Sequence, residues 1–206
     1  LFGNQMYWFF VLLFSWIAVY IITLALLASL DSAEEGLGIL SPNRDGSIFV
    51  YMLLVLVFRF IFLGSEIHIS LDALWYLDFG KFISMGMMPY ADFYFPYPPV
   101  FAYFIATISY SFPAFDSFRL LATFFDLIIV VVLWYSIRTM QDKGPLGLAP
   151  IAYSLLPLAI IESGLNGHFE PIANLFLLVS IIFLYKKKSS LSGVFLGISA
   201  ATKIYA

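Results

Sequence analysis

The chain has no cysteine and few charged residues. Without cysteine it offers neither a disulfide framework nor a thiolate metal site, and its redox compartment cannot be inferred. Charged residues make up 11% of the 206 positions, against about 25% in an ordinary soluble domain. The net charge of −3 provides no basic face for nucleic acid, and no glycine-rich phosphate loop is present. These absences argue against nucleic-acid and nucleoside-triphosphate functions.

Apolar and aromatic residues dominate what remains. The chain is 62% hydrophobic and 19% aromatic, with a mean hydropathy of +0.96. This composition indicates an integral, multi-pass membrane protein of the plasma membrane or the endoplasmic reticulum, in contact with membrane lipid. Many of the 23 Phe and 13 Tyr are expected in aromatic belts at the lipid interfaces.

The apolar runs predict the fold. A membrane-spanning helix needs about 20 residues, and the candidates are 6–30, 47–64, 118–137, 145–161, 171–185 and 192–206. The run 99–112 is shorter and predicts a short or re-entrant helix. We therefore expect an all-α polytopic bundle forming a single transmembrane domain over 1–206, with about six membrane helices and an external loop over 65–98. The chain starts without methionine and stops in an apolar run, so we expect an N-terminal fragment of a longer protein.

Basic residues predict the orientation of the bundle. Lysines 186–188 form the clearest cluster, and Arg138 with Lys143 forms the next. If both clusters are cytoplasmic, the loop 164–171 is external. The loop 65–98 lies on that same side only if 99–112 does not cross the membrane completely. A full crossing would instead turn one of the two basic clusters outward.

The external loop carries two acids with different surroundings. On a helix from Leu71 onward, Asp72 has aromatic residues at the third and fourth positions ahead, so no cation one turn ahead neutralises it. Only His68, four residues earlier, is placed to do so. Asp78 has Lys81 three residues ahead, and this spacing predicts a surface ion pair, although substrate binding stays open. Asp72 is therefore the stronger candidate for chemistry.

The end of this loop is rich in proline and tyrosine. Prolines 89, 96, 98 and 99 disfavour helix and predict a rigid, extended path. The path would hold Tyr90, Tyr94 and Tyr97 as a rim suited to a sugar face or a polyprenyl tail. The same pattern is equally typical of an interfacial belt that only seats the protein in lipid.

Asp126 lies near the middle of the run 118–137, where an unpaired charge costs roughly 3 kcal/mol or more. We expect its side chain to point into the bundle and to bind a basic or hydroxyl-bearing residue. Arg59, Arg119 and Lys203 are the candidate basic partners. A packing role is favoured over a catalytic one.

The chain resembles a known family in the order of its motifs. Asp72 opens the pattern Asp-x-x-Trp-Tyr-x-Asp-Phe-x-Lys-Phe-Ile, and Gly86 opens Gly-x-x-Pro-Tyr, with Tyr-Pro-Pro following at 97–99. A second region, from Asn166-Gly-His-Phe-Glu170 to Thr-Lys203, contains a helix, a basic turn and a small-residue helix. This order is similar to GT-C glycosyltransferases, particularly the dolichyl- or polyprenyl-phosphate-mannose dependent mannosyltransferases. The resemblance covers roughly 47–206.

The resemblance implies an inverting transfer of a hexose such as mannose from a polyprenyl- or dolichyl-phosphate donor to a lipid-linked glycan or protein acceptor. The reaction would occur at the extracytoplasmic or lumenal face. Asp72 would be the general base, while His168 would donate to the leaving phosphate and Glu170 would orient His168 or bind the acceptor. Asn166 and Lys203 begin and end the second matched region and are expected among the residues that bind the substrates.

The resemblance is incomplete at one point. Where many members carry Asp-x-Asp, this chain reads Ser70-Leu71-Asp72, so a divalent metal is possible but a full metal motif is missing. We therefore expect no cofactor. Alternatively, His168 and Glu170 have no catalytic role and only form the start of a helix, because an acid is stabilised at the positive end of the helix dipole.

Two other classes stay open for the whole chain. A non-catalytic polytopic subunit or polyprenyl-lipid transporter would keep the fold without the reaction. A carboxylate-driven ion transporter would place its acids in broken helices within inverted repeats, and no internal repeat is visible.

Overall fold

The computed structural model describes residues 46–64, 70–112, 114–139 and 148–203. The described part of the chain is helical and contains no strand, which confirms the all-α prediction. The predicted span 6–30, His68 and Lys143 lie outside the described residues. In chain order the elements are α2 (Ser47–Phe60), α3 (Leu71–Ser84), α4 (Pro99–Ser111), α5 (Phe115–Thr139), α6 (Ala149–Leu155), α7 (Pro157–Ala159), the π-helix η2 (Ile160–Leu165), α8 (Glu170–Tyr185) and α9 (Ser189–Thr202).

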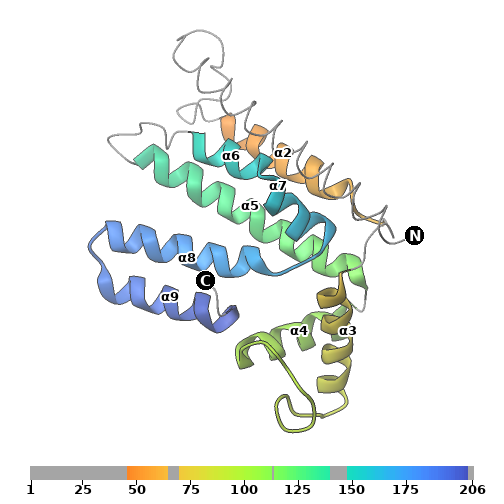
Figure 1. Ribbon diagram of the computed structural model, residues 1–206. Coiled ribbons are helices and arrows are strands. Elements are labelled where there is room, and N and C mark those ends of the chain that lie inside the picture. The colour runs from red at the N-terminus through yellow and green to blue at the C-terminus, as the bar shows by residue number, and fades with distance from the viewer. Residues whose placement is uncertain (1–45, 65–69, 113, 140–147, 204–206) are drawn as a thin grey trace, which may run out of the picture.

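Figure 1 shows three groups of helices. α2 and the α6–α7–η2 segment lie along α5, the hairpin of α8 and α9 crosses below α5, and α3 with α4 projects from one end. Between α2, α5 and α6 the core is aliphatic, with Val55, Val130 and Ile151 buried. Between α3, α4, α5 and α8 the core is largely aromatic.

The local sequence sets several helix ends. Ser70 caps α3, because its hydroxyl oxygen accepts a hydrogen bond from the amide of Ala73 at 3.2 Å. Pro99 begins α4, where its missing amide proton costs nothing. Pro157 divides the predicted span 145–161, because Leu156 before it is extended and ends α6. That span is therefore not one continuous helix, which corrects the expectation.

One described helix is long and apolar enough to cross a membrane by its length and composition. This helix is α5, with 25 residues. The other apolar helices of the described ranges are shorter, so the expected six crossings stay a prediction. α4 has 13 residues and confirms the expected short helix, but its length alone does not say whether it crosses.

The two ends of the bundle differ in their residues. α5 and α8 begin at the same end, since the rings of Phe118 and Phe169 lie 5.5 Å apart near their first turns. Both helices then run in the same direction (Figure 1). As a result, Arg138 and the basic turn 186–188 lie at one end, and the start of α8 lies at the other, beside α3.

Asp126 is fully buried and bound, as expected. Its carboxylate accepts a hydrogen bond from Nε of Arg59 at 2.6 Å, and both side chains have no exposed surface. The hydroxyls of Tyr153 and Ser163 each donate to it at 2.5 Å. The prediction of a basic or hydroxyl-bearing partner is confirmed, and Arg59 is the basic one. Arg119 pairs with Asp116 instead, at 3.0 Å.

Candidate functional site

The two motifs meet at the end of the bundle where α8 begins. Asp72 lies in the first turn of α3, and His168 lies in the connection from η2 to α8. Nε2 of His168 is 3.9 Å from a carboxylate oxygen of Asp72 and 3.0 Å from the hydroxyl of Ser70. Side chains separated by nearly a hundred positions therefore share one site.

The connection that carries His168 depends on a glycine. Gly167 has a φ of +65°, in the left-handed region, and a Cβ there would lie 3.3 Å from atoms of Arg119 and Phe118. Arg119 also holds this connection in place, because it donates a hydrogen bond to the carbonyl oxygen of Leu165 at 2.9 Å. A second hydrogen bond, to the carbonyl oxygen of Phe62 at 2.8 Å, joins Arg119 to the segment that follows α2. The position of His168 is thus set by backbone geometry and by a buried cation.

An aromatic cluster holds α3 against the site. The ring of Tyr76 is fully buried and lies 5.2 Å from that of Phe169 and 6.5 Å from that of His168. Phe101 and Phe118 pack edge-on against the same ring, each at 5.6 Å. Edge-on aromatic pairs stabilise by roughly 0.5–1.5 kcal/mol beyond their buried area. α3 is therefore anchored by ring contacts next to its catalytic candidate.

Glu162, in η2, is the closest partner of His168. Its carboxylate lies 2.5 Å from Nδ1 of His168, the shortest contact of that ring. Burial raises the pKa of Glu162, but the hydrogen bond and the charge of His168, together with the charge of Lys203, lower it more, so the net pKa lies below its usual value. Sequence reasoning missed this residue. The available signal was an acid directly after the apolar run 151–161.

Glu170 and Lys203 form the third part of the site. The ammonium group of Lys203 donates to Oε1 of Glu170, which joins the end of α9 to the start of α8. The same oxygen is 3.8 Å from Nδ1 of His168. The Lys203 side chain is 3% exposed, so its stem is buried and its charge faces the site. The other oxygen, Oε2 of Glu170, is buried and has no hydrogen-bond partner.

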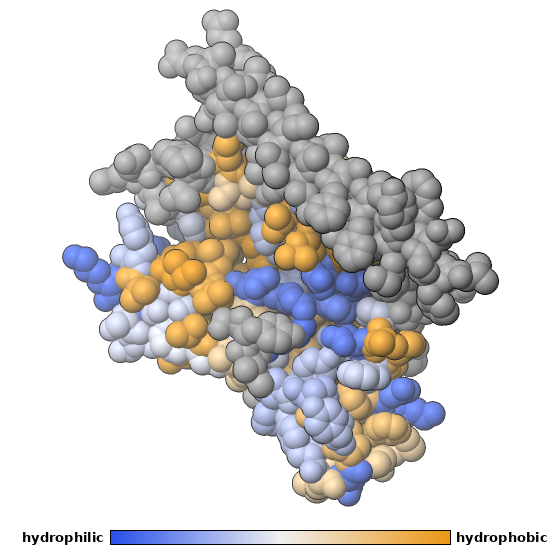
Figure 2. All heavy atoms as spheres, viewed as in Figure 1, coloured by the Kyte–Doolittle hydropathy of each residue, from blue (hydrophilic) through white to orange (hydrophobic). Residues whose placement is uncertain are grey.

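Asn166 contributes its backbone and its amide to this end of the bundle. Its carbonyl oxygen accepts a hydrogen bond from the hydroxyl of Ser70 at 3.1 Å, which ties η2 to α3. Its side-chain oxygen is buried without a hydrogen-bond partner. Figure 2 shows hydrophilic residues gathered over the junction between η2 and α8, bordered by hydrophobic ones. Polar groups gathered within an apolar surface are a feature of ligand sites.

Three of these groups have the spacing of metal ligands. One donor atom each from Glu162, His168 and Glu170 lies within 4.8 Å of the others. Their donors already bind one another or Lys203, since Nδ1 of His168 faces Glu162 and the ammonium of Lys203 faces Glu170. In this structure the three groups form a hydrogen-bonded ion network with Lys203.

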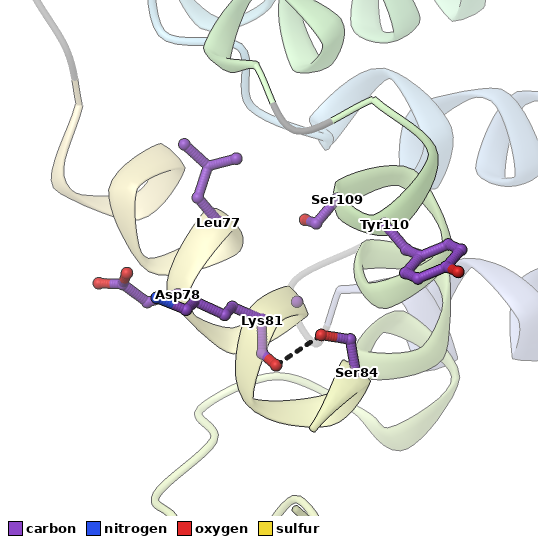
Figure 3. Close-up of a pocket in the computed structure, with 7 residues that line it drawn as sticks. Leu77, Asp78, Lys81, Ser84, Ser109 and Tyr110 are labelled. Carbon is purple, nitrogen blue, oxygen red and sulfur yellow. Dashed lines mark hydrogen bonds between the residues drawn. The ribbon is translucent and has the colours of Figure 1, made fainter. Parts of the chain in front are cut away.

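Asp78 is not brought into this site. A helix with 3.6 residues per turn places residues 72 and 78 about 120° apart, and Asp78 lines a separate pocket of about 360 Å³ between α3 and α4 (Figure 3). Lys81 lines the same pocket, yet no ion pair joins the two side chains, which corrects the expected pair. Both residues are exposed, where water competes with such pairs.

The three tyrosines of the predicted rim lie in different environments. Tyr97 is 9% exposed and packs on the ring of Tyr76, 5.7 Å away, so it belongs to the aromatic core. The hydroxyl of Tyr90 donates to the carbonyl oxygen of Tyr97, and the ring stays half exposed. Tyr94 is 80% exposed. Tyr90 and Tyr94 alone remain available as a rim.

Comparisons with protein-family models, with curated proteins and with solved structures found no match to this chain.

Proposed function

We propose that the chain belongs to an integral membrane glycosyltransferase that moves a sugar from a polyprenyl phosphate to an acceptor on the extracytoplasmic side. The observation that carries this proposal is the 3.9 Å approach of His168 to Asp72. It pairs the candidate base with a group able to donate to a leaving phosphate. An inverting displacement needs both functions in one site but on opposite faces of the sugar, so the two side chains move apart when the sugar enters between them.

Each group has a definite role in this proposal. Asp72 is 33% exposed and takes the proton of the attacking acceptor hydroxyl. His168 and Lys203 offer N–H donors to the phosphate that departs with its lipid, because a phosphate leaving group requires charge stabilisation more than protonation. Glu170 holds Lys203 and fixes the direction of its ammonium group. Of the exposed tyrosines, Tyr90 and Tyr94 would contact a sugar face or the lipid.

The distribution of basic residues supports the sidedness. Arg138 and the turn 186–188 lie at the end of the bundle away from Asp72 and His168 (Figure 1). The preference of lysine and arginine for the cytoplasmic side then puts the site outside. In this arrangement α4 packs on α3 and returns without crossing, and the short apolar helices α2, α8 and α9 act as further spans.

The function is tested with two acids of the same helix. Purified Asp72→Asn should lose about 10²-fold to 10⁴-fold of the transfer from a radiolabelled polyprenyl-phosphate mannose, which is the usual contribution of a positioned base. Asp78→Asn, the matched control, should keep most of it, because Asp78 lines a different pocket. Substantial transfer by Asp72→Asn would end the base assignment, and a folded wild-type chain without transfer from any polyprenyl-phosphate sugar would favour the non-catalytic alternative.

The sidedness is tested by labelling, which is simple because the chain has no native cysteine. Ser84→Cys lies on the exposed side of α3, and Ser189→Cys lies at the exposed start of α9. In sealed right-side-out vesicles an impermeant maleimide should label the first variant and spare the second until the membrane is opened. Labelling of both from one side would contradict the proposed topology.

A further inference from the structure

The hydrogen-bond partners of His168 determine where its protons lie. Nδ1 faces the carboxylate of Glu162 at 2.5 Å, and Nε2 faces the hydroxyl oxygen of Ser70 at 3.0 Å. A glutamate carboxyl group is ordinarily ionised near neutral pH, and an ionised carboxylate only accepts hydrogen bonds. Nδ1 therefore carries a proton.

The hydroxyl of Ser70 decides the state of the second nitrogen. A serine hydroxyl has one proton and two acceptor lone pairs. Ser70 donates that proton to the carbonyl oxygen of Asn166 at 3.1 Å, and one lone pair accepts the amide of Ala73 at 3.2 Å. The remaining lone pair faces Nε2, so the bond between them forms when Nε2 also carries a proton.

A neutral His168 would satisfy fewer groups. Its bare Nε2 would need the hydroxyl proton of Ser70, and the carbonyl oxygen of Asn166 would lose that hydrogen bond. The surrounding charges also favour the cation. Three carboxylates face the ring, with Glu162 at 2.5 Å from η2, Glu170 at 3.8 Å from α8 and Asp72 at 3.9 Å from α3. Lys203 is the cation of the cluster, and it is bound to Glu170.

We propose that Glu162 is a positioning residue that holds His168 as a doubly protonated imidazolium. The ring is held at both nitrogens, and Nε2 lies 3.9 Å from a carboxylate oxygen of Asp72. The cation also adds a positive charge beside the leaving phosphate, whose departure requires charge stabilisation. This last consequence rests on the proposed function, whereas the protonation state does not.

The test is the spectrum of the histidine ring in the full chain. The protein contains two histidines, and His168→Gln identifies the signals of His168 by their loss. In protein labelled with ¹⁵N histidine and held in lipid nanodiscs near neutral pH, both ring nitrogens of His168 should show a directly bonded proton. A ring nitrogen without a proton in the wild-type chain would overturn the proposal.

Variants test the role of Glu162. Glu162→Gln should remove one of the two ring protons, and Asp116→Asn, which removes a carboxylate bound to Arg119 at the same end of the bundle, should remove neither. If Glu162→Gln retained both protons, Glu162 would not be the positioning residue. If that variant does not fold, Glu162→Asp is tested instead, because it keeps the negative charge but moves the carboxylate away from His168. The Nδ1 proton should then exchange with water faster than in the wild type. Unchanged exchange would overturn the assignment.

These readouts do not depend on catalysis. A chain that transfers no sugar but shows the imidazolium would refute the proposed function and leave this inference standing. The reverse result would refute the inference alone.

Discussion

Two clusters of charged side chains lie in the same helix bundle, and they differ in exposure. The Arg59–Asp126 pair has no exposed surface, and three donors converge on the one carboxylate. The cluster around His168 has side chains that are 15–33% exposed, except for Lys203. Each cluster leaves a buried atom without a hydrogen bond, Nη2 of Arg59 in the first and Oε2 of Glu170 in the second. A closed cluster fixes packing, whereas one that is open to solvent can meet a ligand. The comparison predicts that the first affects folding and the second affects chemistry.

The largest expected effect on folding comes from Asp126→Ala. The change leaves the Arg59 guanidinium buried without its carboxylate, which costs about 3–5 kcal/mol for a broken buried pair. The yield of monodisperse protein and its apparent Tm in detergent should both fall sharply. Replacing both partners, as Arg59→Met with Asp126→Leu, should recover part of the loss because no lone charge remains. A double variant no better than Asp126→Ala would contradict this account of the pair.

A smaller effect on stability is expected from a change at the contact between α3 and α4. A Cβ added at Gly80 would lie 2.3 Å from the side chain of Ser109. Gly80→Ala should therefore lower stability by about 1–3 kcal/mol through overpacking. Adding Ser109→Gly should restore part of the loss, because both atoms in the clash belong to Ser109, although a glycine within α4 has its own cost. Gly197→Ala in α9 meets nothing within 4 Å, and as a control it should raise the apparent Tm slightly.

The smallest expected effect is on the pH dependence of stability. The pKa of Glu162 is lowered from a reference of 4.5, so its ionised form stabilises the folded state at pH values above that reference. This contribution is lost as the pH falls through the lower folded value. The apparent Tm of the wild type should therefore decrease more steeply below pH 4.5 than that of Glu162→Gln. Parallel curves would show that Glu162 does not interact with His168 as described.

The sequence predicted the features that depend on local patterns. The apolar run 118–137 predicted α5, and the helix taken from Leu71 onward corresponds to α3. Asp126 required a partner because of its depth in the membrane, and the expected class of partner is present. These inferences needed only the length of apolar runs and the cost of a buried charge.

The remaining features depend on tertiary contacts. The π-helix η2 turns Glu162 toward His168, and no local propensity predicts that turn. Tyr97 was expected at a rim, but the buried ring of Tyr76 draws it into the core. Asp78 seemed paired with Lys81 by spacing, whereas in solvent nothing holds the two together. Which acids meet at the site was therefore set by packing between distant segments.

The account is tested most directly by one measurement, the transfer of radiolabelled mannose from a polyprenyl phosphate per folded molecule, made side by side for Asp72→Asn and Asp126→Asn. The folded amount of each variant is taken from the monodisperse peak on size exclusion. Asp72→Asn should give normal folded protein with little transfer, and Asp126→Asn should give little folded protein whose surviving molecules transfer normally. An active Asp72→Asn, or a well-folded but inactive Asp126→Asn, would contradict the division between the open cluster and the closed one.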